Sequence, residues 1–317
     1  FWLKPFGLNA AFKGCRSGSP SQNLQVLAGL CEEAAPLKRF EQIFLEMADD
    51  SFGESDCLFP YKDLPPTDEH ACGGLRLRCR QIQVERHLIS LFVAACRVED
   101  LDSEALGLHI WPGTHAMARV LLDLERRGEL HGKKVLDVGC GTGFIGILAR
   151  LAGCESVILS DREARALEAA SVNVKANAVD RVAVQALSWG PTGHSAGPDL
   201  RGAFDIVLLS EVLYVAQPLT VPWNLDGTEV SGLMSLTRDV LRPGGVAWVT
   251  YGNREENGTA QVMAAAEEAG LVCKEVPLAD FVPAEDVRPL GAYALRRVRI
   301  FALTHAAAPP ESAAGAQ

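Results

Sequence analysis

The feature that most constrains this chain is a glycine-rich turn, residues 139–143, that directly follows a short apolar run. The run, residues 135–138, leads into glycines at 139, 141 and 143, and an apolar segment begins at Phe144. This order is typical of a strand, a tight turn and a helix. Glycine permits positive φ and lets a ligand approach the backbone, which a Cβ would obstruct. Because free N–H groups at a helix start favour anions, the turn is predicted to seat an anionic group of a ligand.

Segments with strand and helix patterns alternate through the rest of the chain. The predicted strands are 135–138, 157–161, 182–189, 204–210 and 246–251, with late strands near 273–278 and 295–304. The predicted helices are 112–124, 144–152, 164–177, 229–241 and 258–270. Regular alternation of this kind predicts an α/β fold, a parallel sheet with helices on both faces. In such sheets ligands bind at the carboxyl ends of the strands.

The N-terminal quarter follows a different pattern. Residues 23–48 carry apolar side chains at helical spacing, residues 49–74 read as a linker or long loop, and residues 75–84 alternate as a strand would. The segment 88–96 is apolar and short, as in a buried strand or helix. We expect a mostly helical N-terminal extension with linker over 1–74, a catalytic or binding domain over 75–304, and a disordered tail over 305–317.

Charge and cysteine content limit the function classes. The formal net charge is −10 and the basic residues are dispersed, so we expect no nucleic-acid partner. No apolar stretch has the length of a bilayer span, so no membrane is expected. Nine cysteines without a C-x-x-C pair predict reduced thiols in an intracellular compartment, cytoplasmic or nuclear, and no metal site. The chain begins with Phe1, so its true N-terminus is expected to be missing; residues 1–31, basic and free of acids, are interpreted as a disordered extension, with an organelle-targeting segment as the alternative.

Two classes of cofactor use a glycine turn of this kind. Residues 141–146 fit G-x-G-x-x-G, and Asp161 ends the next strand where it could hold a ribose, so a dinucleotide is one candidate. An NAD-dependent oxidoreductase would need a proton donor such as Tyr-x-x-x-Lys, and no lysine stands four residues after tyrosines 214, 251 and 293. S-adenosylmethionine (AdoMet) is the other candidate. A glycine turn that binds no ligand is the plainer alternative.

The pattern Asp137-x-Gly139-x-Gly141-x-Gly143 resembles motif I of the class I, seven-strand AdoMet-dependent methyltransferases. Three further motifs narrow the resemblance to methyltransferase family 16, the protein-lysine methyltransferase-like enzymes. They are Gly107 with Trp111-Pro112, the run Leu187-Ser188-Trp189-Gly190, and Glu211-Val212-Leu213-Tyr214, which matches the Asp/Glu-x-x-Tyr/Phe motif of the family. The resemblance covers residues 75–304. Ser188 departs from it, because the family often has an acid there.

The resemblance implies a Rossmann-like seven-strand methyltransferase sheet whose last two strands form an antiparallel pair. It also implies a cofactor site in which Gly139, Gly141 and Gly143 receive the methionine carboxylate and Asp137 faces the cationic amino-acid end. Asp161 would bind the ribose hydroxyls, and Ser188 and Trp189 would flank the adenine. Trp111 would line the pocket, while Glu211 and Tyr214 would be needed for activity. Helix capping by Asp161 and simple packing of Trp111, Trp189 and Tyr214 are the alternatives.

The function predicted from these residues is AdoMet-dependent methyl transfer to a side-chain nitrogen of another intracellular protein, with lysine favoured and arginine and histidine left open. A small-molecule methyltransferase is the first alternative, because a shared cofactor half does not fix the acceptor half. A non-catalytic AdoMet-binding module is another. The identity of the protein substrate is not predicted.

Overall fold

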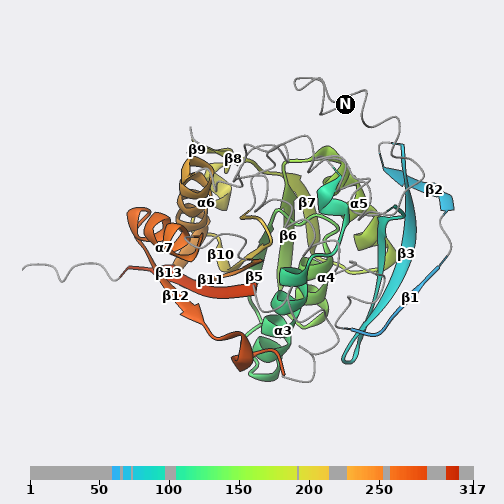
Figure 1. Cartoon of the computed structure of the whole chain (residues 1–317), viewed down its shortest axis with the longest axis horizontal. Helices are drawn as coiled ribbons and strands as arrows, with labels where there is room; N and C mark the ends of the chain where they lie inside the picture. Colours follow the sequence, from blue (N-terminus) through green and yellow to red (C-terminus); the bar gives the residue numbers. More distant parts are fainter. Residues whose placement is uncertain are drawn as a thin grey trace, which may run out of the picture. The chain divides into compact units, whose positions relative to one another are not determined.

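A seven-stranded sheet, the large sheet, lies at the centre of the residues that the structure describes (Figure 1). The computed structural model describes residues 59–64, 67–72, 74–96, 105–190, 193–213, 227–252, 258–283 and 298–306. All of them belong to one compact unit, Ser55–Gln217 together with Pro222–Gln317. The predicted helices of residues 23–48, Tyr214 and residues 307–317 of the predicted tail lie outside the described residues. The tail was predicted to begin at 305, but His305 is the last residue of a strand, Val298–His305.

The strands of the large sheet are β5 (Lys134–Val138), β6 (Ser156–Asp161), β7 (Val182–Ala186), β10 (Phe204–Ser210), β11 (Leu241–Gly252), β12 (Leu271–Val276) and β13 (Val298–His305). Their order is β12-β13-β11-β10-β5-β6-β7. Neighbours from β11 to β7 are parallel, whereas β13 is antiparallel to both β11 and β12. This confirms the predicted Rossmann-like methyltransferase sheet with a late antiparallel pair.

Helices cover both faces of the large sheet, as predicted. They are α3 (Pro112–Arg126), α4 (Phe144–Leu151), α5 (Ala164–Ala176), α6 (Gly227–Val240) and α7 (Gly258–Glu268). Alternate residues of a strand face opposite sides. Accordingly Val135 packs in the core shared with α3 and α4, while Leu136 and Val138 pack with α6 and α7. Asp137 lies on the same face of β5 as Val135, and its side chain accepts a hydrogen bond in the first turn of α4.

A small antiparallel sheet precedes the large one. It contains β1 (Tyr61–Asp63), β2 (Thr67–Cys72), β3 (Leu75–Val84) and β4 (His87–Ala94). The prediction of a strand at 75–84 is confirmed, and the apolar segment 88–96 is mostly a strand. The prediction of a linker or loop through 49–74 was wrong for 61–63 and 67–72, because β1 and β2 pair with β3 although they are short and polar. The division of the chain at residue 75 stays a prediction.

Several element boundaries differ from the predicted ones by a few residues, and two of them, in β7 and β11, have a clear structural reason. The third strand, β7, ends at Ala186, and Trp189 instead opens a two-strand hairpin, β8 (Trp189–Gly190) with β9 (Gly193–His194). This hairpin packs on α6 so closely that a Cβ on Gly232 would lie 2.3 Å from the Gly190 carbonyl oxygen. Strand β11 begins at Leu241 rather than 246, because Leu241 already pairs with Phe204 before an irregularity in the register.

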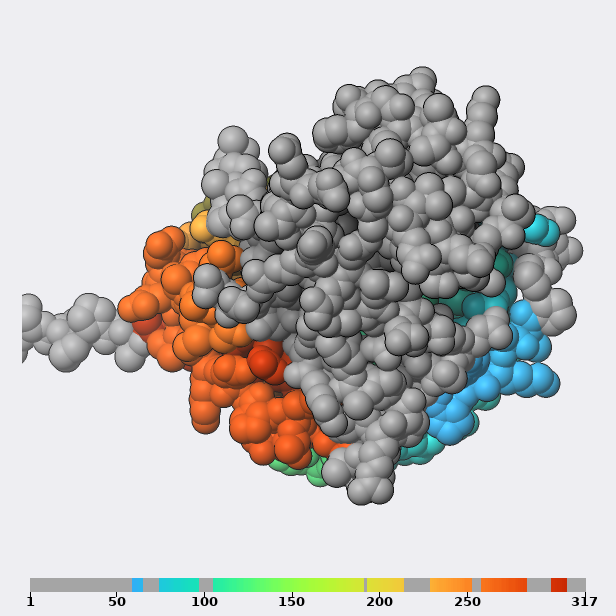
Figure 2. Space-filling view, viewed as in Figure 1, coloured from blue at the N-terminus to red at the C-terminus, as the bar shows by residue number. Residues whose placement is uncertain are grey.

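Short 3-10 helices complete the described chain: η5 (Leu106–Leu108), η6 (Pro198–Leu200) and η7 (Leu278–Asp280). In the space-filling view, α7 and β12 in orange and the first strands in blue reach the surface (Figure 2). None of the helices in the described part of the chain combines the length and the apolarity needed to span a bilayer.

Candidate functional site

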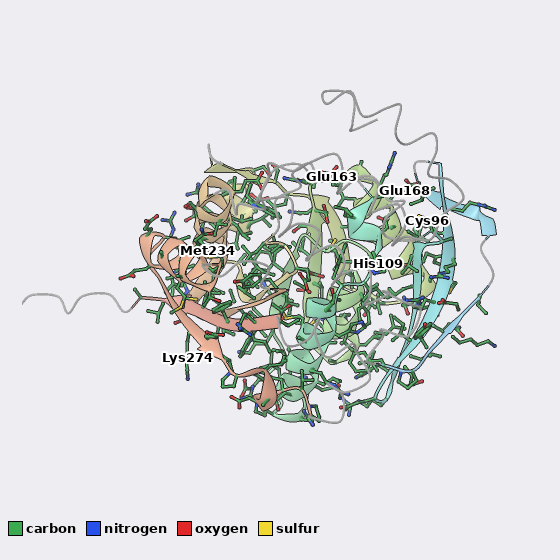
Figure 3. All side chains as sticks on the ribbon, in the orientation of Figure 1. Cys96, His109, Glu163, Glu168, Met234 and Lys274 are labelled. Atoms are coloured by element: carbon green, nitrogen blue, oxygen red, sulfur yellow. The ribbon has the colours of Figure 1, made fainter. Side chains whose placement is uncertain are left out.

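A pocket opens at the carboxyl ends of β5, β6 and β10, where the fold predicts a ligand. Most of the residues predicted from the sequence line it: Trp111, Asp137, Gly139, Gly141, Asp161, Trp189 and Glu211. Figure 3 labels two further lining residues, His109 and Glu163, which come from the segments before α3 and before α5. The elements thus bring together side chains that lie up to about a hundred residues apart in the sequence.

The glycines of the turn are required by close contacts within the protein. Gly139 and Gly141 have positive φ, 66° and 51°. A Cβ on Gly141 would lie 2.4 Å from the Gly107 carbonyl oxygen, and a Cβ on Gly139 would lie 2.4 Å from a methyl carbon of Val212. Both distances are far below van der Waals contact, so these positions exclude any other residue without movement. The turn is held between the segment before α3 and the end of β10.

Two buried carboxylates support the turn. Asp161 accepts hydrogen bonds from the Gly141 N–H at 3.0 Å and the Glu163 N–H at 3.0 Å, one on each oxygen. Asp137 accepts the Gly146 N–H at 3.0 Å. Burial raises the pKa of Asp161 above its usual value, although the hydrogen bonds oppose the shift. Burial raises the pKa of Asp137 to about 7, with the Gly146 N–H opposing and the charge of Asp161 adding to the shift.

The two predicted tryptophans lie on different walls of the pocket. Trp111 immediately precedes α3, and its indole N–H donates to the Leu106 carbonyl at 3.1 Å. The His109 ring meets the Trp111 ring edge-on, with centroids 5.2 Å apart. Burial, and then the charges of Arg80 and Arg78, lower the pKa of His109 to about 4, so its imidazole is neutral at pH 7. Trp189 is half-buried at the start of the β8–β9 hairpin.

Glu211, which follows β10, is hydrogen-bonded to the start of α3 and to the end of β11. Its side chain accepts the Gly113 N–H in the first turn of α3 at 2.7 Å and the Gly252 N–H at the end of β11 at 3.2 Å. Its own N–H donates to the Thr250 carbonyl at 2.7 Å. Its φ of 56° is unusual for a residue with a side chain. These contacts fix the start of α3, and with it Trp111, against the sheet; a role in catalysis stays a prediction.

Two predicted residues lie away from the pocket lining. Gly143 caps α4 with φ 79°, and its α-carbon faces Leu159 and Ala170 behind the turn. Ser188 is exposed, and its N–H donates to the Ser195 hydroxyl at 2.9 Å. Their predicted cofactor contacts, like that of Tyr214 outside the described residues, stay predictions.

The sequence interpretation missed several lining residues, of which the charged ones are Arg162, Glu163 and Glu229. Arg162 and Glu163 follow Asp161 directly, so their place after β6 was a usable signal. Glu229 had none, because its position depends on how α6 packs. With Asp137, Asp161 and Glu211 the lining holds five carboxylic acids beside Arg162, which itself lies 3.9 Å from Glu229. An acid-rich lining of this kind favours cationic ligands.

Comparison with known proteins agrees with this site. Residues 95–224 match the family model described as lysine methyltransferase, a range that contains the turn, Asp161, Trp189 and Glu211. The predicted family resemblance is confirmed. Protein N-lysine methyltransferase METTL21A from Mus musculus is 36% identical over 96 residues, 29% of this chain and 42% of that protein. Ribosomal protein L11 methyltransferase from Marinobacter nauticus is 31% identical over 139 residues, 44% of this chain and 40% of that protein.

The methyltransferase match has a limited extent. The chain spans about two fifths of the length of both curated relatives. A solved structure, ribosomal protein L11 methylase from Lactobacillus delbrueckii subsp. bulgaricus, has a TM-score of 0.42 at 17% identity, covering 62% of this chain and 81% of that one. That similarity is too low to add an argument. The match to a methyltransferase family model agrees with AdoMet as the predicted cofactor of the pocket.

Proposed function

We propose that this chain is an AdoMet-dependent methyltransferase that methylates a side-chain nitrogen, foremost that of lysine, in another intracellular protein. The observation that carries the proposal is the acid-rich lining of a glycine-turn pocket at the carboxyl ends of the strands. AdoMet carries a sulfonium and an ammonium group, and a lysine substrate brings a further amine. A dinucleotide would instead bring two phosphate charges toward five carboxylic acids and a single arginine.

The residues of the pocket fit AdoMet part by part. The N-terminus of α4 and the amides of the turn would receive the carboxylate of the methionine moiety. Asp161 accepts the Gly141 N–H on one oxygen and the Glu163 N–H on the other, and its carboxylate would also accept the ribose hydroxyls. Asp137 lies near the end of β5 with its side chain bonded to the first turn of α4, and there it would face the ammonium group. Trp111 and Trp189, which line the pocket from different segments of the chain, would contact the cofactor.

When bound, AdoMet supplies an electrophilic methyl group on a sulfonium. The task left to the chain is to hold a nucleophile in line with the methyl group and to exclude water. A lysine amine, with a reference pKa near 10.4, must first release its proton to solvent, and an apolar channel lowers that pKa. Tyr214 would form part of this channel, and Glu211 would position the substrate amine, the cofactor or both. No covalent intermediate on the protein is needed.

Methyl transfer from labelled AdoMet tests the proposal. The purified chain is incubated with cell lysate and methyl-labelled AdoMet, proteins are separated from small molecules, and labelled residues are identified by mass spectrometry. The proposal predicts label on lysine side chains, lost with Glu211→Ala and reduced with Tyr214→Phe, while replacement of the exposed Glu129 by Ala leaves it unchanged. Label confined to the small-molecule fraction, or AdoMet binding without transfer, would contradict the proposal.

A further inference from the structure

Two asparagines, Asn173 inside α5 and Asn177 at its C-terminal cap, pair with the backbone of strand β4 as a neighbouring strand would. The Asn177 side chain accepts the Ser90 N–H at 2.9 Å and donates to the Ser90 carbonyl at 2.7 Å. The Asn173 side chain accepts the Phe92 N–H at 2.6 Å and donates to the Phe92 carbonyl at 3.2 Å. The free edge of β4 in the small sheet is thereby satisfied by amide side chains of a helix.

The spacing of the two elements explains why asparagine fits at both positions. Four residues of a helix rise about 6 Å, and two residues of a strand rise about 6.6 Å. Residues four apart on α5 therefore face residues two apart on β4. A carboxamide carries one acceptor oxygen and an NH2 donor, so it offers the acceptor and the donor of a peptide unit and has one further N–H. Asparagine is otherwise a poor residue for a helix interior.

Asn173 makes a further bond that Asn177 does not. Its amide nitrogen also donates to the carbonyl of Thr142, inside the glycine turn, at 2.8 Å. The orientation of the amide follows from its partners, because the Phe92 N–H can bond only to an oxygen and the Thr142 carbonyl only to a donor. The same Thr142–Gly143 peptide is held on its other side, where the Gly143 N–H donates to the Cys140 carbonyl at 2.7 Å.

Asn173 lies in closely packed surroundings. Its side chain is fully buried between α5, β4 and the turn. The α5 face that carries it is lined with alanines that approach the turn, since a Cβ on Gly143 would lie 3.4 Å from the Ala170 Cβ. The contact is therefore close and without space for substitution by a larger side chain. Loss of the amide would leave the Thr142 carbonyl buried without its donor.

We propose that Asn173 is a positioning residue through which the small sheet sets the shape of the cofactor turn. The Asn173 amide is hydrogen-bonded both to the β4 backbone and to the peptide group between Thr142 and Gly143, which directly precedes α4. The orientation of this plane determines where the amides of the turn point. The inference rests on the proposed function, because the property that it governs is AdoMet affinity. Asn177 shares the β4 contact and also donates to the Asn173 carbonyl at 2.7 Å, but it makes no hydrogen bond to the turn, so it provides the control.

Calorimetric binding of S-adenosylhomocysteine, together with urea unfolding of the same full-length proteins, separates the two contacts. Asn173→Ala and Asn177→Ala should both lower the free energy of unfolding, because each leaves a backbone N–H and carbonyl of β4 unpaired. Only Asn173→Ala should also weaken S-adenosylhomocysteine binding, by about tenfold or more. Asn173→Asp, which keeps an acceptor for Phe92 but lacks the donor for Thr142, should weaken it as well.

Equal affinities for the two alanine variants would overturn the inference while leaving the proposed function intact. If the unmodified protein fails to bind S-adenosylhomocysteine, the proposed function itself fails and the inference with it. Should Asn173→Ala not fold, Asn173→Asp supplies the same comparison. Amide hydrogen exchange gives a readout independent of any ligand: peptides covering residues 140–144 should exchange faster in the Asn173 variants than in Asn177→Ala, and equal exchange would contradict the inference.

Discussion

Replacing Glu211 removes the clamp between α3 and the large sheet, and its cost can be worked out from the structure. The side chain is almost fully buried and accepts the N–H groups of Gly113 and Gly252. In Glu211→Ala both donors lose their partner. The positive φ at this position is unchanged, because alanine and glutamate are strained alike there.

The expected magnitude follows from the two lost hydrogen bonds. A hydrogen bond to a charged group contributes about 1.5–3 kcal/mol, and the bond of 3.2 Å to Gly252 is the weaker of the two. Glu211→Ala should therefore lower the free energy of unfolding by about 2–4 kcal/mol. Glu211→Gln keeps one acceptor but turns an amide toward the second N–H, so its loss should be smaller. Glu211→Gly should recover about 1 kcal/mol relative to alanine, because glycine tolerates the positive φ.

Urea unfolding followed by circular dichroism measures these differences, with Glu129→Ala as the control. Glu129 is an exposed residue with an arginine neighbour, and its replacement should change the free energy of unfolding by no more than about 0.5 kcal/mol. The free energy of unfolding should be highest in Glu129→Ala, lower in Glu211→Gln, lower again in Glu211→Gly and lowest in Glu211→Ala. A loss below about 0.5 kcal/mol in Glu211→Ala would refute the clamp, because no buried N–H can then depend on that carboxylate.

Three further predictions concern the turn and buried titratable groups. Gly141→Ala should abolish S-adenosylhomocysteine binding in calorimetry, whereas Gly202→Ala, at a similar φ of 59° but with open space around its Cβ, should retain it. The pKa of Asp137 in the folded state is raised to about 7, so its stabilising contribution is present below about pH 3.8 and is lost as the pH rises to 7. Asp137→Asn should therefore make the unfolding free energy depend less on pH over that range. Burial lowers the pKa of His115 to about 3, so its contribution to stability is present above pH 6.5 and is lost as the pH falls toward 3; His115→Leu should therefore flatten the dependence of the unfolding free energy on pH over that range.

The large sheet could be predicted from the sequence because each of its strands is a local apolar run with its own turn signal. Phe204–Ser210 is an example, a nearly continuous apolar strand that is buried on both faces. Strands β1 and β2 escaped prediction because their residues are polar and they are stabilised only by pairing with β3. Tertiary pairing, and not local propensity, makes them strands.

The candidate site was predictable where a local sequence motif determines the conformation of the backbone. Gly139, Gly141 and Asp161 lie where the strand and turn pattern placed them. The partners of Glu211 were not predictable, because Gly113 and Gly252 are about a hundred and forty residues apart and meet it only through the packing of α3 on the sheet. Asn173 was missed for the same reason: in the sequence it is one polar residue of a helix, and its role depends on β4.

The central claim is that the pocket binds AdoMet, and calorimetry with S-adenosylhomocysteine and NAD on the full chain tests it most directly. Asp161→Asn is the companion variant, because it keeps an acceptor for the Gly141 N–H while removing the charge and one acceptor from the ribose site. We predict micromolar binding of S-adenosylhomocysteine, weakened at least tenfold in Asp161→Asn, and no binding of NAD. Binding of NAD, or of neither compound, would contradict the account.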